Sequence, residues 1–333
     1  MSRVAIIGAG SWGTALAIIA GRAGHSVRLW SRSAGVVEAI NGGRRNSGYL
    51  PAHEIPPGVE ATNDLSAALC AAELVLLAAP SHVTRELLAR MLPGARPEMV
   101  FASATKGIET ETGKRISEVL HEVMGVRFEP RFVCLSGPSF AEEVAAGYPT
   151  AVVAASRSAD DSRFVQATLS FGNLRLYTNS DVAGTEIGGA VKNVMALAAG
   201  MVSGLGLGTN SVAALITRGL AEIARFALAQ GAQLETLMGL AGMGDLVLTC
   251  TGGLSRNRYV GQELGKGRAL AEIVGGMREV AEGIKTTLAV HRLARELKVE
   301  MPITNEVHAV LYEGKKAHEA AAALMTRPLR MEF

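Results

Sequence analysis

The sequence is poor in cysteine and in charged residues. Its three cysteines, Cys70, Cys134 and Cys250, are far apart and odd in number, which argues against a disulfide framework and suits the reducing cytoplasm. They form no Cys-x-x-Cys pair, and we name no metal-ligating residues. Lys and Arg number 33 against 31 Asp and Glu, a formal net charge of +2, so there is no basic excess to bind nucleic acid. We therefore predict a cytoplasmic protein without a nucleic-acid partner.

Signals for export and for a membrane span are weak. Met1-Ser2-Arg3 leads at once into an apolar strand, which leaves no room for a signal peptide. Residues 193–217 carry no charge, but four glycines and the polar run Thr209-Asn210-Ser211 would break a helix that spans lipid. We predict two buried helices there, in a protein that is not membrane-embedded.

Apolar residues and glycine are plentiful. Hydrophobic side chains make up 48% of the 333 residues, and 38 residues are glycine. This length suits about two domains, each with its own core. The glycine excess indicates tight turns and close backbone approaches.

Short β-rich runs alternate with helical patterns up to about residue 180. Several of the runs are continuously apolar, as expected of strands covered on both faces. The alternation predicts an α/β, Rossmann-like, doubly wound parallel sheet over residues 1–183. The expected strands are Val4–Ile7, Val27–Trp30, Leu74–Ala78, Met99–Ala102, Phe132–Leu135 and Ala151–Ala154.

The β signal fades in the second half of the chain. Segments rich in Ala, Leu and Glu with helical periodicity replace it, so we predict an all-α domain over residues 184–333. The expected helices include Ala213–Gln230, Asn257–Leu264, Lys285–Lys298 and Ile303–Glu313.

The segment 8–13, Gly-Ala-Gly-Ser-Trp-Gly, has the spacing GxGxxG between an expected strand and an expected helix. In this context Gly8 allows the sharp turn, Gly10 lets a pyrophosphate approach the backbone, and Gly13 lets the helix pack closely. The start of the helix would offer its amides to the phosphates. The segment therefore predicts a dinucleotide site.

The end of the second strand bears on which nicotinamide nucleotide binds. NAD sites normally carry an acidic residue about 20 positions after the glycines. Here the strand runs into Ser31-Arg32-Ser33, with no carboxylate. Arg32 suits the 2′-phosphate of NADP. We predict that NADPH is preferred and that NAD is possible; a solvated Arg32 is the alternative.

Two further segments follow expected strands. Lys106 comes just after the fourth strand, at the sheet edge where ligands of parallel sheets bind, although a loop lysine in water is as plausible. Residues 136–143 follow the fifth strand, and Ser139 is suited to cap or open a helix whose amides meet an anion. A purely structural turn explains that segment equally well.

Lys192 interrupts an apolar helical pattern. Burial disfavours an ammonium group and lowers its pKa, which suits a general acid or base. The alternative is that the side chain reaches the surface. Three glycines surround Asp245 and indicate a carboxylate held close to another group. Ser255-Arg256-Asn257-Arg258, at an expected helix start, offers a grip for a phosphate or a plain helix cap.

Taken together, these segments resemble the bacterial NAD(P)-dependent glycerol-3-phosphate dehydrogenases. The resemblance runs from the first strand almost to the C-terminus, with eight motifs in order. The matching stretches are GAGSWG at 8–13, ATKGIE at 104–109, SGPSFAEEV at 136–144, AVKNVMALAAG at 190–200, TRGLAE at 217–222, GLAGMGDLVLTC at 239–250, SRNR at 255–258 and VAEGIKT at 280–286.

The resemblance implies hydride transfer from NADPH or NADH to dihydroxyacetone phosphate, giving sn-glycerol 3-phosphate for glycerophospholipid synthesis. It implies that Lys192 transfers the proton, that Asp245 positions the lysines and a substrate hydroxyl, and that Lys106 touches both ligands. The implied substrate-binding residues are Lys106, Gly137, Ser139, Lys192, Asp245, Ser255, Arg256 and Asn257. The implied cofactor-binding residues are Gly8, Gly10, Ser11, Trp12, Gly13, Arg32, Lys106, Ala141, Arg256, Val280 and Glu282.

The chain departs from the family at Ser33, where many relatives carry a second basic residue; this leaves room for NADH. A homodimer is the family expectation. Two other functions stay open at this point. A β-hydroxyacid or ketopantoate-type reductase shares the glycine motif and a Lys-Asn pair but has no use for residues 255–258. A nicotinamide-binding sensor without turnover would need neither Lys192 nor Asp245.

Overall fold

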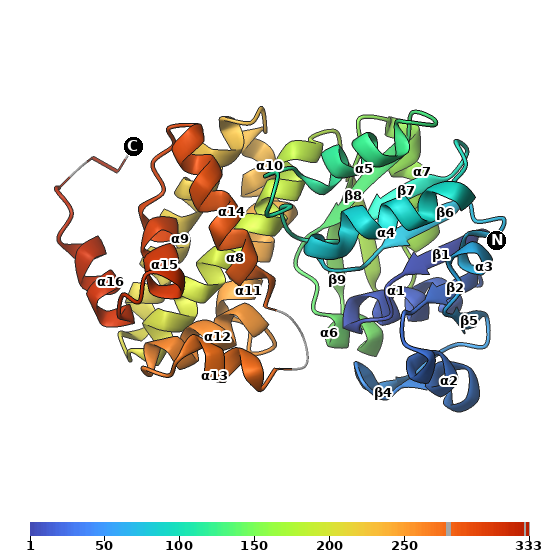
Figure 1. Ribbon diagram of the computed structural model, residues 1–333, viewed down its shortest axis with the longest axis horizontal. Helices are drawn as coiled ribbons and strands as arrows, with labels where there is room; N and C mark the ends of the chain where they lie inside the picture. The colour runs from blue at the N-terminus through green and yellow to red at the C-terminus, as the bar shows by residue number, and fades with distance from the viewer. Residues whose placement is uncertain (278–280, 330, 333) are drawn as a thin grey trace.

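The computed structural model describes residues 1–277, 281–329 and 331–332. The N-terminal part is a sheet covered by helices, and the C-terminal part consists of helices that pack against one end of it (Figure 1). The predicted fold class, a Rossmann-like domain followed by an all-α domain, is confirmed.

The main sheet has eight strands in the order β10-β9-β8-β7-β6-β1-β2-β5. The six strands from β8 to β5 run parallel, so their carboxyl ends meet at one edge. All the expected strands are present, within a residue or two. The bounds are β1 Arg3–Ile7, β2 Ser26–Trp30, β5 Val59–Thr62, β6 Leu74–Leu77, β7 Val100–Ser103, β8 Arg131–Ser136, β9 Thr150–Ala155 and β10 Leu174–Asn179.

The predicted parallel sheet contains one antiparallel pair toward one edge. β9 pairs antiparallel with β8, and β10 runs parallel to β9. The connection from β8 to β9 covers residues 137–149 and contains the six-residue helix α6, Ala141–Ala146. A crossover that returns the chain for a parallel strand needs a dozen or more residues, usually with a helix. This connection lies close to that lower limit, and β9 runs antiparallel to β8 instead.

Helices cover both faces of the sheet (Figure 1). Residues 108 and 115 form an isolated antiparallel bridge just before α5 begins at Ile116. The remaining elements of this domain are α1 Ser11–Arg22, α2 Ala34–Gly43, β3 Arg45–Asn46, β4 Leu50–Glu54, α3 Leu65–Leu69, η1 Ser81–Val83, α4 Thr84–Met91, η2 Leu92–Gly94, α5 Ile116–Met124 and α7 Ala159–Leu169.

The second half is organised around α8, Val182–Gly204. By length and composition this helix could cross a membrane, but 89% of its most apolar window is buried inside the protein. It is the core helix of the domain. The others are α9 Gly208–Leu228, α10 Leu234–Met238, the π-helical turn η3 Leu240–Gly244, α11 Asp245–Thr251, α12 Arg256–Gly265, α13 Leu270–Gly275, α14 Glu282–Glu296, α15 Pro302–Tyr312 and α16 Ala317–Met325.

Glycines let α8 and α12 approach closely. A Cβ atom on Gly200 would lie 2.1 Å from the carbonyl oxygen of Arg258, and one on Gly261 would lie 2.0 Å from that of Leu197. Because no side chain fits there, the backbones pack directly against each other. This contact fixes the start of α12 beside the middle of α8, where Lys192 lies.

At the junction, each domain buries a side chain in a core of the other domain. Ile108, from the loop after β7, is buried in the core of the helical domain. Ala241, from η3, is buried in a core beneath the sheet. The last strand ends at Asn179 and α8 begins at Val182. The boundary that we place between residues 183 and 184 remains a prediction.

Candidate active site

Three charged side chains meet where the carboxyl edge of the sheet faces the helical domain. Lys192 on α8 is only 5% exposed. Its Nζ donates to Oδ1 of Asp245 and, at 2.9 Å, to the hydroxyl of Thr249. The alternative that Lys192 reaches the solvent is therefore wrong.

Asp245 is fully buried at the first position of α11 and receives both lysines. Its Oδ2 accepts from Nζ of Lys106 at 2.7 Å, while Oδ1 accepts from Lys192. The π-helical turn η3 brings it there: a Cβ on Gly242 would lie 2.0 Å from the carbonyl oxygen of Leu237, and one on Gly188 would lie 2.7 Å from that of Ala241. The glycines around Asp245 thus permit this packing.

Lys106 reaches the site from the sheet domain. It follows β7, and its Nζ also donates to the carbonyl oxygen of Gly137 at 3.0 Å. Gly137 has φ +141° and a Cβ there would lie 2.9 Å from Cα of Val152, so only glycine fits. Ser139 does not cap α6, whose N-cap is Phe140; its hydroxyl donates instead to the same carbonyl of Gly137 at 2.9 Å.

The combined effect of burial and neighbouring charges lowers the pKa values of both Lys192 and Asp245. The pKa of Lys192 is lowered to about 7: burial is the main cause, the charge of Lys106 adds to it, and Asp245 opposes both effects. Burial alone would raise the pKa of Asp245, but the two ammonium groups outweigh it and the pKa is lowered. The site therefore holds an ionised carboxylate beside a lysine that releases its proton near neutral pH.

The glycine-rich turn fits a dinucleotide. A Cβ on Gly8 would lie 2.8 Å from the carbonyl oxygen of Ala78, and one on Gly13 would lie 1.8 Å from that of Gly8, so packing within the protein explains both. A Cβ on Gly10 would meet nothing within 4 Å. Gly10 caps α1 without a side-chain hydrogen bond. The bare backbone at Gly10 and the amides at the start of α1 match the needs of a pyrophosphate.

The other predicted cofactor residues of the sheet domain lie around this turn. The hydroxyl of Ser11 donates to the carbonyl oxygen of Tyr49 at 3.0 Å. Trp12 shares a small pocket with Lys106, Ser136 and Ser139, which joins the turn to the triad. Ala141, half-buried, is the first residue of α6, and α6 packs against α1.

Arg32 is exposed just after β2, at the same edge of the sheet as the glycine turn. Ser33, the departure from the family pattern, is the N-cap of α2 and accepts from the amide of Val36 at 3.4 Å. Its side chain therefore has a structural task, which a long basic residue would not perform.

The start of α12 faces the triad from the helical domain. Ser255 is the N-cap, which is the alternative that the sequence left open for this segment, and its hydroxyl accepts from the amide of Arg258. Arg256 is exposed. Asn257 is buried, donates to Oδ1 of Asn193 at 3.0 Å, and accepts from the amide of Gly283 at 2.9 Å.

Glu282 links the first turn of α14 to the sheet domain. Its Oε1 accepts from the amide of Ser81 at 3.2 Å, and a Cβ on Gly107 would lie 2.9 Å from Oε2. Burial raises the pKa of Glu282 to about 7, which Arg256 partly opposes. Val280, the other cofactor residue predicted in this stretch, lies outside the described residues.

Sequence reasoning assigned no role to two residues that complete this arrangement. Thr249 accepts from Lys192 and donates to the backbone carbonyl of Asp245 at 2.6 Å. Asn193 holds Asn257, and so ties α8 to the start of α12. The four-residue spacing from Asp245 to Thr249 on one helix was the available signal.

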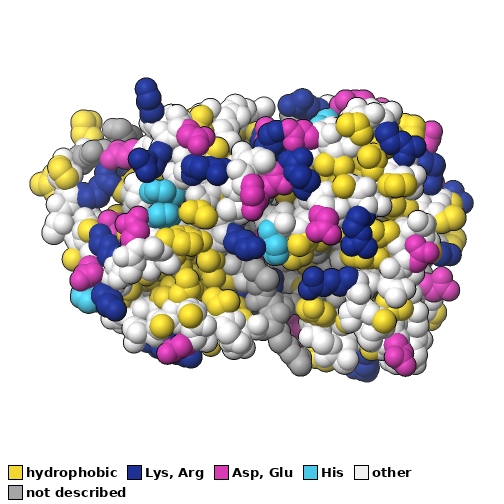
Figure 2. Space-filling view, in the orientation of Figure 1, with side chains coloured by type: hydrophobic (Ala, Val, Ile, Leu, Met, Phe, Trp, Pro, Cys, Tyr) yellow, Lys and Arg dark blue, Asp and Glu magenta, His cyan; other side chains and the backbone are white. Residues whose placement is uncertain are grey.

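Charge on the visible face of the molecule is mixed. Figure 2 shows basic and acidic side chains interspersed across both domains, in line with the net charge of +2. The site therefore draws its positive charge from the local residues Lys106, Lys192 and Arg256 rather than from a basic surface.

Comparisons with known proteins agree along the whole chain. Residues 3–162 match the family model for the N-terminus of NAD-dependent glycerol-3-phosphate dehydrogenase, and residues 181–322 match that for its C-terminus. The chain is 57% identical to the glycerol-3-phosphate dehydrogenase [NAD(P)+] of Koribacter versatilis, over 100% of this chain and 99% of that protein. It is 51% identical to that of Geobacter sulfurreducens, over 99% and 98% of the two chains. The crystal structure of glycerol-3-phosphate dehydrogenase from Coxiella burnetii has a TM-score of 0.94 and 40% identity, over 98% of this chain and 99% of that one.

Proposed function

Because this chain belongs to the NAD-dependent glycerol-3-phosphate dehydrogenase family, we propose that the triad Lys192, Lys106 and Asp245 is its catalytic centre. The enzyme uses NAD or NADP to interconvert dihydroxyacetone phosphate and sn-glycerol 3-phosphate. One observation carries the proposal: a buried lysine and a lysine from the other domain share one buried carboxylate at the sheet edge that the glycine turn also reaches.

Lys192 is the proposed general acid for ketone reduction. The bound nicotinamide supplies the hydride, and the carbonyl oxygen of the substrate gains negative charge as that hydride arrives. An ammonium group beside this oxygen stabilises the charge and then protonates it. With its pKa lowered to about 7, Lys192 gives up this proton readily and takes it back in the oxidation direction. Asp245 and Thr249 hold Nζ in place.

Arg256 and the start of α12 are the proposed phosphate site. The side chain of Ser255 caps the helix, and that of Asn257 is hydrogen-bonded to Asn193 and to the amide of Gly283. The helix start therefore keeps a fixed position next to α8. The positive end of the helix dipole and an exposed guanidinium group favour a dianionic phosphate. We place Gly137 and Ser139 on the opposite wall, with the substrate between them.

The substrate assay separates this function from the alternatives. Purified protein is given NADPH and either dihydroxyacetone phosphate or a non-phosphorylated keto acid, and the loss of NADPH absorbance is followed. Turnover with the phosphorylated ketone alone supports the proposal. Arg256→Ala should mainly raise the KM for that ketone, although a contact with the cofactor would blur the separation. Turnover with the keto acid alone would favour the ketopantoate-type reaction, and no turnover would favour a sensor.

The preference for NADP rests on Arg32. The exposed guanidinium at the end of β2 can bind the 2′-phosphate, and its neighbours Ser31 and Ser33 offer no carboxylate for the ribose hydroxyls of NAD. Arg32→Asp should shift the ratio of kcat/KM for NADPH to that for NADH toward NADH. An unchanged ratio would remove Arg32 from cofactor selection.

The setting of the enzyme follows from the family rather than from the site. We propose a cytoplasmic homodimer, not embedded in a membrane, that acts on a small phosphorylated substrate. The long apolar helix α8 is buried within the helical domain, which supports the proposal that it does not lie in a membrane. Size-exclusion chromatography with light scattering would test the dimer, and cell fractionation would test the location.

A further inference from the structure

The loop that carries Lys106 lies between the two domains. It runs from the end of β7 at Ser103 to the start of α5 at Ile116. Lys106 near its beginning reaches Asp245, and Ile108, two residues later, is buried in the helical core. Further on, a Cβ on Gly113 would lie 2.8 Å from Cδ2 of Leu293 on α14. The shape of this loop therefore decides where Lys106 stands relative to the helical domain.

Glu109 holds the loop together from within. Its backbone amide donates to the carbonyl oxygen of Lys114 at 2.9 Å, and its own carbonyl accepts from the amide of Gly113 at 2.8 Å. Its carboxylate accepts from the hydroxyl of Thr112 at 2.5 Å. The side chain is buried, so its charge needs partners.

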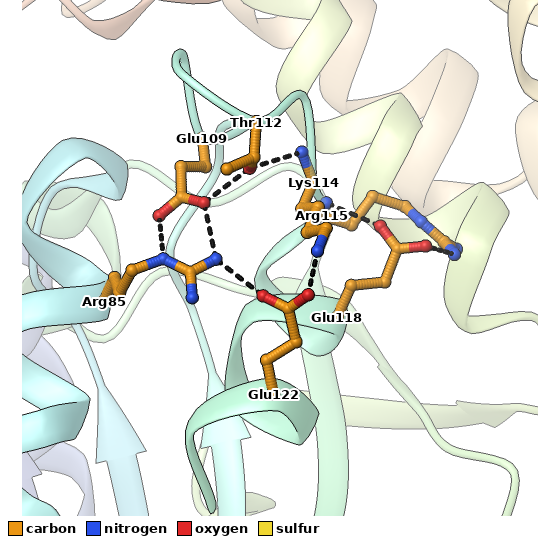
Figure 3. Close-up of polar contacts among 7 residues, drawn as sticks. All are labelled: Arg85, Glu109, Thr112, Lys114, Arg115, Glu118 and Glu122. Atoms are coloured by element: carbon orange, nitrogen blue, oxygen red, sulfur yellow. Dashed lines mark hydrogen bonds and ion pairs between the residues drawn. The ribbon is translucent and has the colours of Figure 1, made fainter.

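Arg85 on α4 supplies the main partner. Its Nε donates to Oε1 of Glu109 at 2.8 Å and its Nη2 to Oε2 at 2.7 Å, a two-pronged contact (Figure 3). Nη2 also reaches Oε2 of Glu122 on α5 at 2.8 Å, and Glu122 contacts Lys114 at the far side of the loop. The guanidinium thereby clamps the loop between two helices of the sheet domain. The hydrogen bond from Arg85 is the main cause that lowers the pKa of Glu109.

We propose that Arg85 is a positioning residue for the reaction, which acts by gripping Glu109 so that Lys106 is held against Asp245. The inference rests on the proposed function, because it assigns Arg85 to the same triad. Arg85 itself touches neither Lys106 nor Asp245 in the described contacts; it acts through the loop. A planar guanidinium fixes both distance and direction, which a lysine in the same place does not.

A structural role and a positioning role predict different results. The side chain of Glu109 is only 8% exposed, so loss of Arg85 leaves a buried carboxylate without its main partner, and either role predicts a lower melting temperature. Only a positioning role also predicts slower turnover in the folded enzyme, because a small displacement of a catalytic group has a large effect on kcat. The charge of Lys106 also lowers the pKa of Lys192, so a displaced Lys106 should let that pKa rise.

The test compares Arg85→Met with Arg85→Lys and with the neighbouring control Glu86→Gln, an exposed position on the same helix. We expect Arg85→Met to lower kcat about tenfold while leaving the KM for NADPH nearly unchanged. The pH above which ketone reduction declines should move upward, in the direction that Lys106→Met moves it. The charged groups acting on Lys192 are Asp245 and Lys106, with Cys250 nearby, and none of them is altered in Arg85→Met. Arg85→Lys should recover little, and Glu86→Gln should behave as wild type.

Hydrogen exchange gives a readout that does not need turnover. In Arg85→Met the amides of Glu109 and Gly113 should exchange faster, while those of α1 keep their protection. Wild-type exchange in the loop would overturn the proposal, even in a protein without dehydrogenase activity. Faster exchange with unchanged kcat and pH profile would also overturn it, because the clamp would then be structural only. If wild type turns over and Lys192→Ala does not, the proposed function stands whichever way Arg85 falls.

Discussion

Two buried carboxylates of the helical domain face different neighbours. Asp245, at the start of α11, accepts from the ammonium groups of Lys192 and Lys106. Glu222 on α9 accepts from the amide of Ile303 at 2.6 Å and from the amide and hydroxyl of Thr304 at 3.2 and 3.3 Å. Both are almost inaccessible, at 0% and 1% exposed. The pKa of Asp245 is nevertheless lowered, whereas burial raises the pKa of Glu222 to about 7.

The difference lies in what compensates the loss of water. Two full positive charges outweigh the desolvation of Asp245, so it stays ionised and in turn controls the protonation of Lys192. The N–H groups at the start of α15 carry only partial charges, so they do not outweigh the burial that raises the pKa of Glu222. The first arrangement has the proposed role in proton transfer, and the second joins two helices. Glu186, which accepts from the amide and hydroxyl of Ser117 at the start of α5, repeats the second arrangement between the domains.

The largest effect is expected when the ammonium group of Lys192 is removed from its place beside Asp245. Lys192→Ala should lower kcat for ketone reduction at least about 10²-fold, because it removes the ammonium group proposed to stabilise and protonate the carbonyl oxygen. Steady-state NADPH oxidation measures it. Glu222→Gln is the matched control, a buried change in the same domain, and should keep kcat within about twofold of wild type. Near-full turnover of Lys192→Ala would remove the general acid from the mechanism.

Asp245→Asn tests the carboxylate in the same triad. Two ammonium groups would be left buried and facing each other, which should lower the free energy of unfolding by about 3 kcal/mol. Because Asp245 raises the pKa of Lys192, its loss should let Lys192 shed its proton at lower pH. Ketone reduction should therefore decline at a lower pH than in wild type. A pH profile that moves upward, or not at all, would contradict the assigned coupling.

Parts of the candidate active site could be predicted from the sequence. Gly8, Gly10 and Gly13 have the spacing that a strand-turn-helix needs, and Lys192 is conspicuous because it interrupts an apolar helix. Their positions follow from local rules of turns and of burial. The family resemblance then joined Lys106 and Asp245 to them across more than 50 residues of chain, which no local rule could do.

The second arrangement was invisible in the sequence. Glu222 stands on a helix of ordinary amphipathic composition, and its partners Ile303 and Thr304 come 81 and 82 residues later. A glutamate on a helix usually faces water, so pattern alone indicates the wrong side. The direction of β9 was also not predicted, because an alternation of strands and helices does not show which way a strand near the edge of the sheet runs. Arg85 and Glu109 likewise meet only in the folded chain.

Glu222 makes the free energy of unfolding depend on pH. A carboxyl with a pKa of about 4.5 when unfolded and about 7 when folded binds its proton more tightly in the folded state. Its stabilisation is complete below the unfolded value and is lost as the pH rises through 7. The free energy of unfolding should fall by about 2 kcal/mol between about pH 5 and pH 7 from this group alone. Glu222→Gln should flatten the decline in urea melts, and an equally steep decline would assign it to other groups.

The smallest expected effect comes from removing one hydroxyl that donates to Glu186 or to Glu222. Each hydroxyl belongs to a residue at the start of a helix, α5 for Glu186 and α15 for Glu222. The hydroxyl of Ser117 lies 2.5 Å from Glu186, whereas that of Thr304 lies 3.3 Å from Glu222. Ser117→Ala should lower the free energy of unfolding by about 1 kcal/mol, the usual worth of such a bond, and Thr304→Val should lower it by less. Since the hydroxyl of Ser117 also lowers the pKa of Glu186, its removal should raise that pKa above about 7. Urea melts of the two variants at the same pH compare them directly. A larger loss in Thr304→Val would mean that a helix start within one domain depends more on its carboxylate than the junction between domains does.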